Sequence, residues 1–233
     1  MLKAIFKREM LSCFTTMTGY VFIGVFMFLS SIFFSMEMFR NRVGSVTGIL
    51  PMCMVILMLL MPIITMRLMA EEKANKTDQL LLTAPVKVSE IVLGKFFAAF
   101  CVFLISTATT LFYVLVAAIW GDIHPGETFA SYLGYILFGA LLIAIGLYIS
   151  CLTESQVVAA VLTYGVTLLL FFSSWINTGI DFIDYIIGFF KIAGWNESFS
   201  MGVIAPSGVM YYLSFTFLFL LLSVRKTESR RWR

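Results

Sequence analysis

Six apolar stretches, each about as long as a membrane-spanning helix, constrain what this chain can fold into more than any other feature. A helix needs roughly 20 mostly apolar residues to cross the hydrocarbon core of a bilayer. The stretches cover residues 17–36, 47–66, 94–119, 129–151, 156–176 and 206–224. Composition agrees, because 61% of the 233 residues are hydrophobic and only 12% are charged, against about 25% charged in soluble domains. The sequence therefore predicts an all-α integral membrane protein with a single domain of six transmembrane helices.

Residues 1–15 precede the first apolar stretch and differ from it. Their apolar residues recur at helical spacing, with charged residues opposite, which is typical of a helix that lies in the membrane interface. A merely charged flank is the alternative. The first stretch itself has an apolar run longer than that of a cleaved signal peptide, and no cleavage-like site follows it.

The lysines and arginines predict the orientation in the membrane. Twelve of the sixteen fall before the first stretch, between the second and third, or after the sixth, and a thirteenth, Lys95, lies at the start of the third. Positive charge accumulates on the cytoplasmic side of membrane proteins. Both termini and residues 67–93 are therefore predicted to be cytoplasmic.

The centres of the six stretches contain no ionisable residue, which argues against an ion-coupled carrier, because such proteins place charges at membrane depth. Their hydroxyl groups favour helix packing, with a hydroxyl-lined substrate path as the alternative. Enzyme motifs are missing too: the chain has no GxxxxGK[ST], no HExxH and no CxxC, and His124 lies in a turn-forming loop. We expect no catalytic residue, no bound cofactor and no metal site.

Residues 67–93 form the one long charged insert in the first half of the chain. Residue types favour a helix from Met66 to Leu82, which Pro85 would end. Glu71 and Glu72 precede Lys76 at a spacing that supports such a helix. With both charged and apolar surface, the helix is suited to a partner's groove, although a solvated linker fits the residues equally well.

The stretch PIITMRLMAEEKANKTDQLLLTAPVKVSEIVLGK resembles the cytoplasmic segment of type-2 ATP-binding-cassette exporter permeases. The matching positions are Pro62, Arg67, Glu71, Glu72, Thr77, Leu80, Leu81, Pro85, Gly94 and Lys95. The branch of gliding-motility-associated and nitrous-oxide-reductase maturation permeases is the most similar, and both ends of the chain resemble that branch. One position departs from the family: a glycine usually precedes the threonine, whereas Lys76 does here.

The resemblance implies a half-channel subunit in the bacterial inner membrane. It implies an interfacial N-terminal helix, six spans, a coupling helix after the second span and a short re-entrant helical segment before the sixth. Its partners would be a cytoplasmic ATPase dimer, which binds the ATP, a second permease and membrane lipids; we expect no nucleic acid. The coupling residues would be Arg67, Glu71, Glu72, Lys73, Thr77, Leu80 and Leu81. For Arg67, an anchor at the lipid headgroups is the alternative.

Residues 177–205 are too polar at their ends to span a membrane and too apolar to form a free loop. The resemblance implies an outer gate with Ile186, Phe189 and Phe190. A flat amphipathic helix on the outer surface is the alternative.

These features together predict the membrane-spanning permease subunit of an ATP-driven exporter, which is not itself an enzyme. The alternative from another class is a non-transporting scaffold or assembly subunit of a cell-surface machine.

Overall fold

The computed structural model describes residues 2–41, 46–77, 86–120, 124–173 and 197–231, and within these ranges the chain is helical and has no strands. The helices are α1 (Leu2–Thr15), α2 (Thr18–Asn41), α3 (Val46–Thr65), α4 (Arg67–Ala74), α6 (Val88–Trp120), α7 (Pro125–Leu152), α8 (Gln156–Phe172), α10 (Glu197–Ser200) and α11 (Pro206–Arg231). The predicted all-α class is confirmed.

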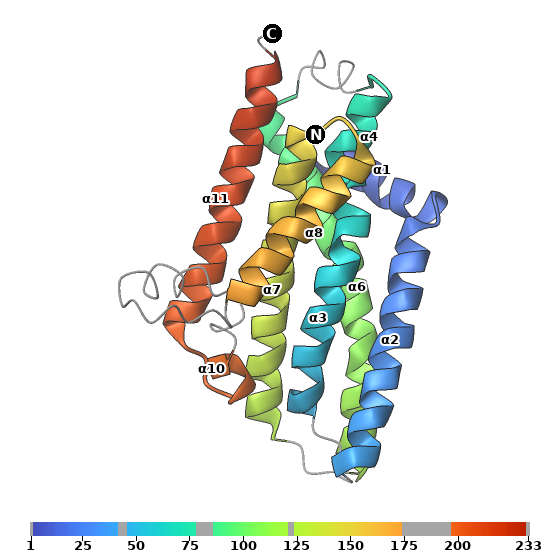
Figure 1. Cartoon of the computed structure of the whole chain (residues 1–233), viewed down its shortest axis with the longest axis vertical. Helices are drawn as coiled ribbons and strands as arrows, with labels where there is room; N and C mark the ends of the chain where they lie inside the picture. The colour runs from blue at the N-terminus through green and yellow to red at the C-terminus, as the bar shows by residue number, and fades with distance from the viewer. Residues whose placement is uncertain (1, 42–45, 78–85, 121–123, 174–196, 232–233) are drawn as a thin grey trace.

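The long helices alternate in direction, so that both termini and α4 lie at the same end of the bundle (Figure 1). Among the residues that the structure describes, five helical stretches are long and apolar enough to cross a membrane: Thr18–Phe39, Gly48–Ala74, Val88–Ile119, Pro125–Leu152 and Pro206–Arg230. A sixth apolar helix, α8, has 17 residues, the lower end of the range that spans a bilayer. It ends before the predicted boundary at residue 176, and residues 174–176 lie outside the described ranges.

Four spans extend beyond their predicted apolar ranges, and the third and sixth do so most. The third begins at Val88 instead of residue 94, because Glu90 in the first turn favours a helix N-terminus. The sixth continues from residue 224 to Arg231, because the basic tail contains no glycine or proline that would end the helix. Both extensions lie at the end of the bundle where the termini are.

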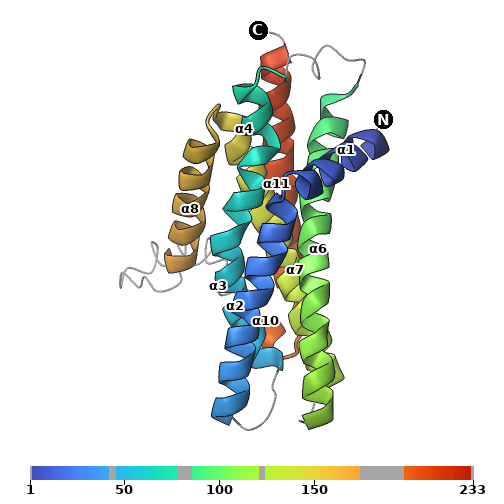
Figure 2. The same cartoon turned by 90° about the vertical axis from the view of Figure 1, so that its right-hand side faces the viewer.

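Helix α1 lies across that end of the bundle instead of running along it (Figure 2), as expected of an interfacial helix. A left-handed backbone at Met17, with φ 59°, makes the corner between α1 and α2. Gly94 on α6 allows α1 to approach closely, because a Cβ there would lie 2.9 Å from Ile5 Cγ2.

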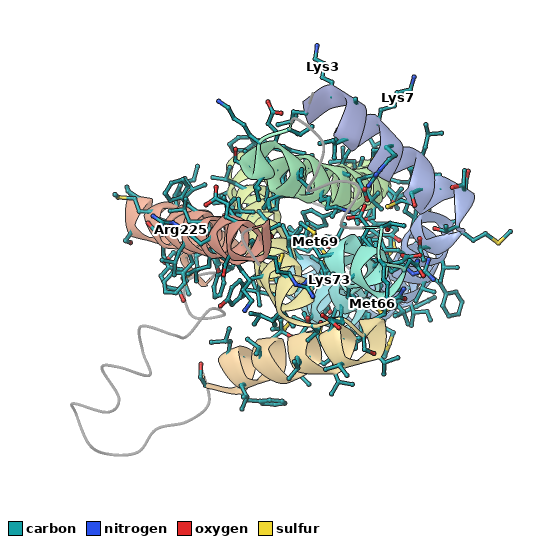
Figure 3. The ribbon with its side chains drawn as sticks, turned by 90° about the horizontal axis from the view of Figure 1, so that it is seen from above. Lys3, Lys7, Met66, Met69, Lys73 and Arg225 are labelled. Atoms are coloured by element: carbon teal, nitrogen blue, oxygen red, sulfur yellow. The ribbon has the colours of Figure 1, made fainter. Side chains whose placement is uncertain are left out.

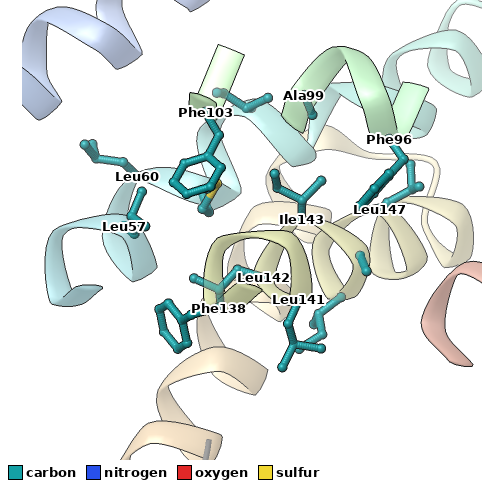
Figure 4. Close-up of a cluster of buried hydrophobic side chains, with 14 of the residues drawn as sticks. Leu57, Leu60, Phe96, Ala99, Phe103, Phe138, Leu141, Leu142, Ile143 and Leu147 are labelled. Atoms are coloured by element: carbon teal, nitrogen blue, oxygen red, sulfur yellow. The ribbon is translucent and has the colours of Figure 1, made fainter. Parts of the chain in front are cut away.

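Helix α7 is at the centre of the bundle and packs against α3, α6, α8 and α11. Seen end-on, α1, α8 and α11 lie at the periphery (Figure 3). The core joins side chains of α3, α6 and α7, including Leu57, Phe103, Phe138 and Leu142 (Figure 4).

Two glycines on α7 permit these close helix contacts. A Cβ at Gly139 would lie 2.3 Å from Phe103 Cζ, and one at Gly146 would lie 2.3 Å from Thr65 Oγ1. Small residues are the usual means of close helix packing in membranes, where apolar burial against lipid gives little driving force.

The outer segment is described only from residue 197 onward. Short helix α10 packs on α7: Phe199 is fully buried, and its carbonyl accepts a hydrogen bond of 3.1 Å from Ser131 Oγ. The predicted gate residues Ile186, Phe189 and Phe190 lie outside the described ranges.

Candidate functional site

Helix α4 follows α3 almost directly, at the end of the bundle that holds the termini (Figure 1). It is shorter than the helix predicted for Met66–Leu82, since it ends at Ala74. The Lys76 amide bonds the Lys73 carbonyl at 3.1 Å, and the Thr77 amide bonds the Glu72 carbonyl at 2.9 Å. This is a Schellman C-cap, in which the residue at the position of Lys76 is left-handed.

Lys76 has a φ of 56° in this cap. Glycine is favoured at such a position because it has no Cβ to clash with the following carbonyl. The lysine that departs from the family pattern therefore stands in the left-handed position itself, and Asn75 before it keeps a right-handed backbone.

The apolar face of α4 is used inside the chain. Leu68, Met69 and Ala70 are buried, and α4 packs against α7 and α8. The apolar surface of α4 that was predicted to contact a partner therefore packs on the membrane helices of the same chain. The exposed part is the last residue of α4 with the C-cap that follows it, residues 74–77, which we call the tip.

Ser150, near the end of α7, caps the start of α4. No side chain of the residue before α4 caps this helix. Instead the fully buried Ser150 Oγ accepts hydrogen bonds from the amides of Met69 (3.0 Å) and Ala70 (2.9 Å) and donates one to the Met66 carbonyl (3.2 Å). One hydroxyl thereby gives an acceptor to the Met69 amide, which is among those that a helix start leaves without a partner, and also bonds the next amide, that of Ala70.

Lys73 makes the reciprocal contact from α4 to α7. Its Nζ donates to the carbonyls of Cys151, Ser150 (3.5 Å) and Thr153 (3.4 Å), where α7 ends. A cation at a helix C-terminus is stabilised by the helix dipole and by the unpaired carbonyls. Each of the two helices thus caps an end of the other, and α4 cannot shift without disturbing α7.

A cluster of four charges joins α4 to α1 and α6. Lys95 Nζ on α6 lies 3.0 Å from Glu72 Oε2 and 3.1 Å from Glu9 Oε1, and Arg8 forms ion pairs with both carboxylates. Lys95 is only 1% exposed. A charge buried to this degree is tolerable only when it is paired.

The cluster controls the ionisation of its members on α1. Burial alone would raise the pKa of Glu9, but the Lys95 ammonium and the Arg8 guanidinium outweigh it and lower that pKa. Burial alone would lower the pKa of Arg8, whereas the carboxylates of Glu9 and Glu72 raise it. Both charges are therefore held in place by this cluster. The Glu72 carboxylate is engaged here, although the helical spacing had suggested Lys76 as a partner.

Arg67 and Glu71 lie on another face of α4, beside a small cavity between α1, α2 and α3. The cavity encloses about 30 Å³ and is also lined by Glu9, Ser12 and Cys13. Arg67 Nε is buried and has no hydrogen-bond partner among the described residues. A cavity of this size holds one or two waters.

The predicted coupling residues therefore fall into distinct groups. Glu72 and Lys73 bind within the chain, Arg67 and Glu71 border the small cavity, and Thr77 lies at the exposed tip. Leu80 and Leu81 lie outside the described ranges. Inspection of the sequence missed Ser150, for which a hydroxyl in an apolar span gives no signal. The sequence analysis also missed the pairing of Lys95. A lysine at the start of an apolar span was a signal that could have indicated a buried ion pair.

The remaining polar groups support packing roles. Ser106, Thr107 and Thr163 donate to carbonyls of their own helices, while Thr110 pairs with Tyr132 and Ser30 with Tyr113 across helices. His124 lies at the N-cap of α7, where its carbonyl accepts a bond from the Thr128 amide. The described part of the chain holds no group of three potential metal ligands.

Comparison with known protein families shows to which family the chain belongs. Residues 35–195, about two thirds of the chain, match the family model described as ABC-2 family transporter protein. The chain belongs to this family. No curated protein matches the sequence. The ABC-2 match covers α3, α4, α6, α7 and α8, and so includes the helix with the Ser150 and Lys73 contacts. The chain is thus a multi-pass membrane permease of the ABC-2 type.

Proposed function

We propose that this permease is the membrane-spanning subunit of an ATP-driven exporter and that α4 is its coupling helix. A cytoplasmic ATPase dimer would bind the ATP and hold the tip of α4, and a second permease would complete the pathway. The observation that carries this proposal is the mutual capping of α4 and α7 through Ser150 and Lys73.

The contacts of α4 suit it to passing on a movement. Its base is joined to α7 by hydrogen bonds and to α1 and α6 by the charge cluster, while its tip at residues 74–77 is exposed. A displacement at the tip must therefore move α7, which packs against four other membrane helices. Packed interfaces of this kind change by discrete shifts, which is what a transport cycle needs.

Orientation and environment belong to the same proposal. With the termini and α4 at one end of the bundle, the distribution of lysine and arginine supports a cytoplasmic position for that end. The bacterial inner membrane is the location that the family resemblance implies. Membership of the gliding-motility and nitrous-oxide-reductase maturation branch stays a prediction.

Two classes of variant test the proposal separately. Ala74→Trp and Lys76→Glu alter the exposed tip, whereas Ser150→Ala and Lys73→Gln leave the tip unchanged and remove the mutual caps. The permease is purified from native membranes, and the ATPase that accompanies it is identified by mass spectrometry. Permease-dependent ATPase turnover is then measured in liposomes.

We expect the tip variants to lose the ATPase and the cap variants to retain it with reduced permease-dependent turnover. Lys226→Gln, at the exposed end of α11, serves as the control. If the cap variants couple normally, α4 does not act through α7. If no ATPase ever accompanies the native chain, the scaffold alternative is favoured.

A further inference from the structure

A groove between the interfacial helix and the third span is not filled by any residue that the structure describes. It encloses about 340 Å³. Its apolar walls are Leu2 and Phe6 of α1 and Phe97, Phe100, Cys101 and Leu104 of α6. We refer to it as the α1–α6 groove.

The groove runs along α6 away from α1. Its four residues on α6 recur at the spacing of one helix face, and from Phe97 to Leu104 they extend about 10 Å along the axis. That length is about a third of the hydrocarbon core of a bilayer. Phe97 remains 44% exposed and Leu104 36%, so the described chain leaves both available to a ligand.

Positive charge marks the α1 end of this groove. Lys3 lines it, and Lys7 follows one helical turn later. Both lysines project from α1 away from the bundle (Figure 3). Neither forms an ion pair with another described residue, whereas Arg8 beside them is engaged by Glu9 and Glu72.

We propose that the α1–α6 groove binds one anionic phospholipid, with an acyl chain along Phe97 and Leu104 and the phosphate on Lys3 and Lys7. The arrangement of charge above an apolar trough matches that ligand, because a phospholipid carries its negative group at the membrane interface and its chain below. A helix of a second copy would bring apolar surface, but the centres of the membrane-spanning helices carry no anion for the two lysines. The proposal does not depend on coupling to an ATPase.

A bound lipid would also stabilise the charge cluster. It would contact both α1 and α6, and these helices carry Arg8, Glu9 and Lys95. Lipid occupancy and the position of α4 are thereby linked through Glu72.

Native mass spectrometry of the full chain in detergent tests this proposal, with phosphatidylglycerol and phosphatidylcholine titrated separately. Lys3→Gln/Lys7→Gln removes the charge, and both residues are exposed, so that the fold is preserved. Cys101→Phe fills the α1–α6 groove without changing its charge. Lys226→Gln removes an exposed lysine of α11, a helix that does not line the groove.

The native chain is expected to retain one phosphatidylglycerol and to bind phosphatidylcholine more weakly. A lysine near an anionic lipid contributes roughly fivefold, so the double variant should bind on the order of 25-fold more weakly. Cys101→Phe should also lose the lipid, and Lys226→Gln should keep it. Equal retention of both lipids, or by all variants, would overturn the proposal. So would a dimer that Cys101→Phe dissociates without changing lipid binding, since the groove would then be an interface between copies.

Discussion

Replacing Ser150 with alanine should release the start of α4 from α7. The substitution removes the Ser150 hydroxyl that accepts from the buried amides of Met69 and Ala70 and donates to the Met66 carbonyl. Losing a partner costs a buried backbone group about 1–3 kcal/mol, and losing a helix N-cap costs about 0.5–2 kcal/mol. We expect α4 to lose about 2–4 kcal/mol of local stability.

Hydrogen exchange of the Met69 and Ala70 amides measures this loss where it occurs. Because about 1.4 kcal/mol corresponds to a factor of ten, both amides should exchange roughly 30- to 1000-fold faster, up to the limit set by local opening of α4. Ser106→Ala is the matched control: Ser106 is equally buried, but it donates only to the Phe103 carbonyl of its own helix. If the two variants exchange alike at α4, the capping role of Ser150 is refuted.

Three further predictions concern other contacts. Lys76→Gly should stabilise α4 by about 0.5–1 kcal/mol and so slow its hydrogen exchange, because glycine adopts the left-handed conformation without strain. Lys76→Ala keeps the Cβ and should not slow exchange. Gly146→Ala should lower the detergent melting temperature by several degrees through its contact with Thr65, whereas Gly165→Ala, with open space around it, should be neutral or stabilising; equal effects would contradict the packing argument. The lowered pKa of Glu9 means that its stabilising contribution is present above its ordinary value of 4.5 and is lost as pH falls through the folded value. The difference in melting temperature between the native chain and Glu9→Gln should therefore shrink from pH 6 to below pH 4, and a constant difference would contradict the ion-pair interpretation.

Much of the fold could be predicted because each span carries its own signal. Transfer of a helix into lipid depends on the residues within that helix, so the apolar ranges located each span, most closely α3. The ends were less accurate. Helix α6 begins before its apolar range because charged residues can continue a helix into the interface. Helix α4 ends before its predicted end because Lys76 adopts a left-handed backbone conformation, which a lysine side chain disfavours but does not prevent.

The candidate site could be predicted only in its location. The charged insert correctly indicated α4, but the roles of its side chains depend on residues far away in the chain. Glu72 pairs with Arg8, 64 positions earlier, and Lys73 with carbonyls near Ser150, 77 positions later. Neither partner has a local pattern that distinguishes it from other charges or hydroxyls.

The sequence by itself determined that the chain is a helical membrane protein, where its spans lie and where its charged insert falls, because partitioning between water and lipid is decided helix by helix. Only the tertiary structure decided that this insert is joined to the membrane helices by Ser150, Lys73 and Lys95. Buried hydrogen bonds and ion pairs require partners within about 3 Å, and only the packing of α1, α6 and α7 around α4 brings those partners so close.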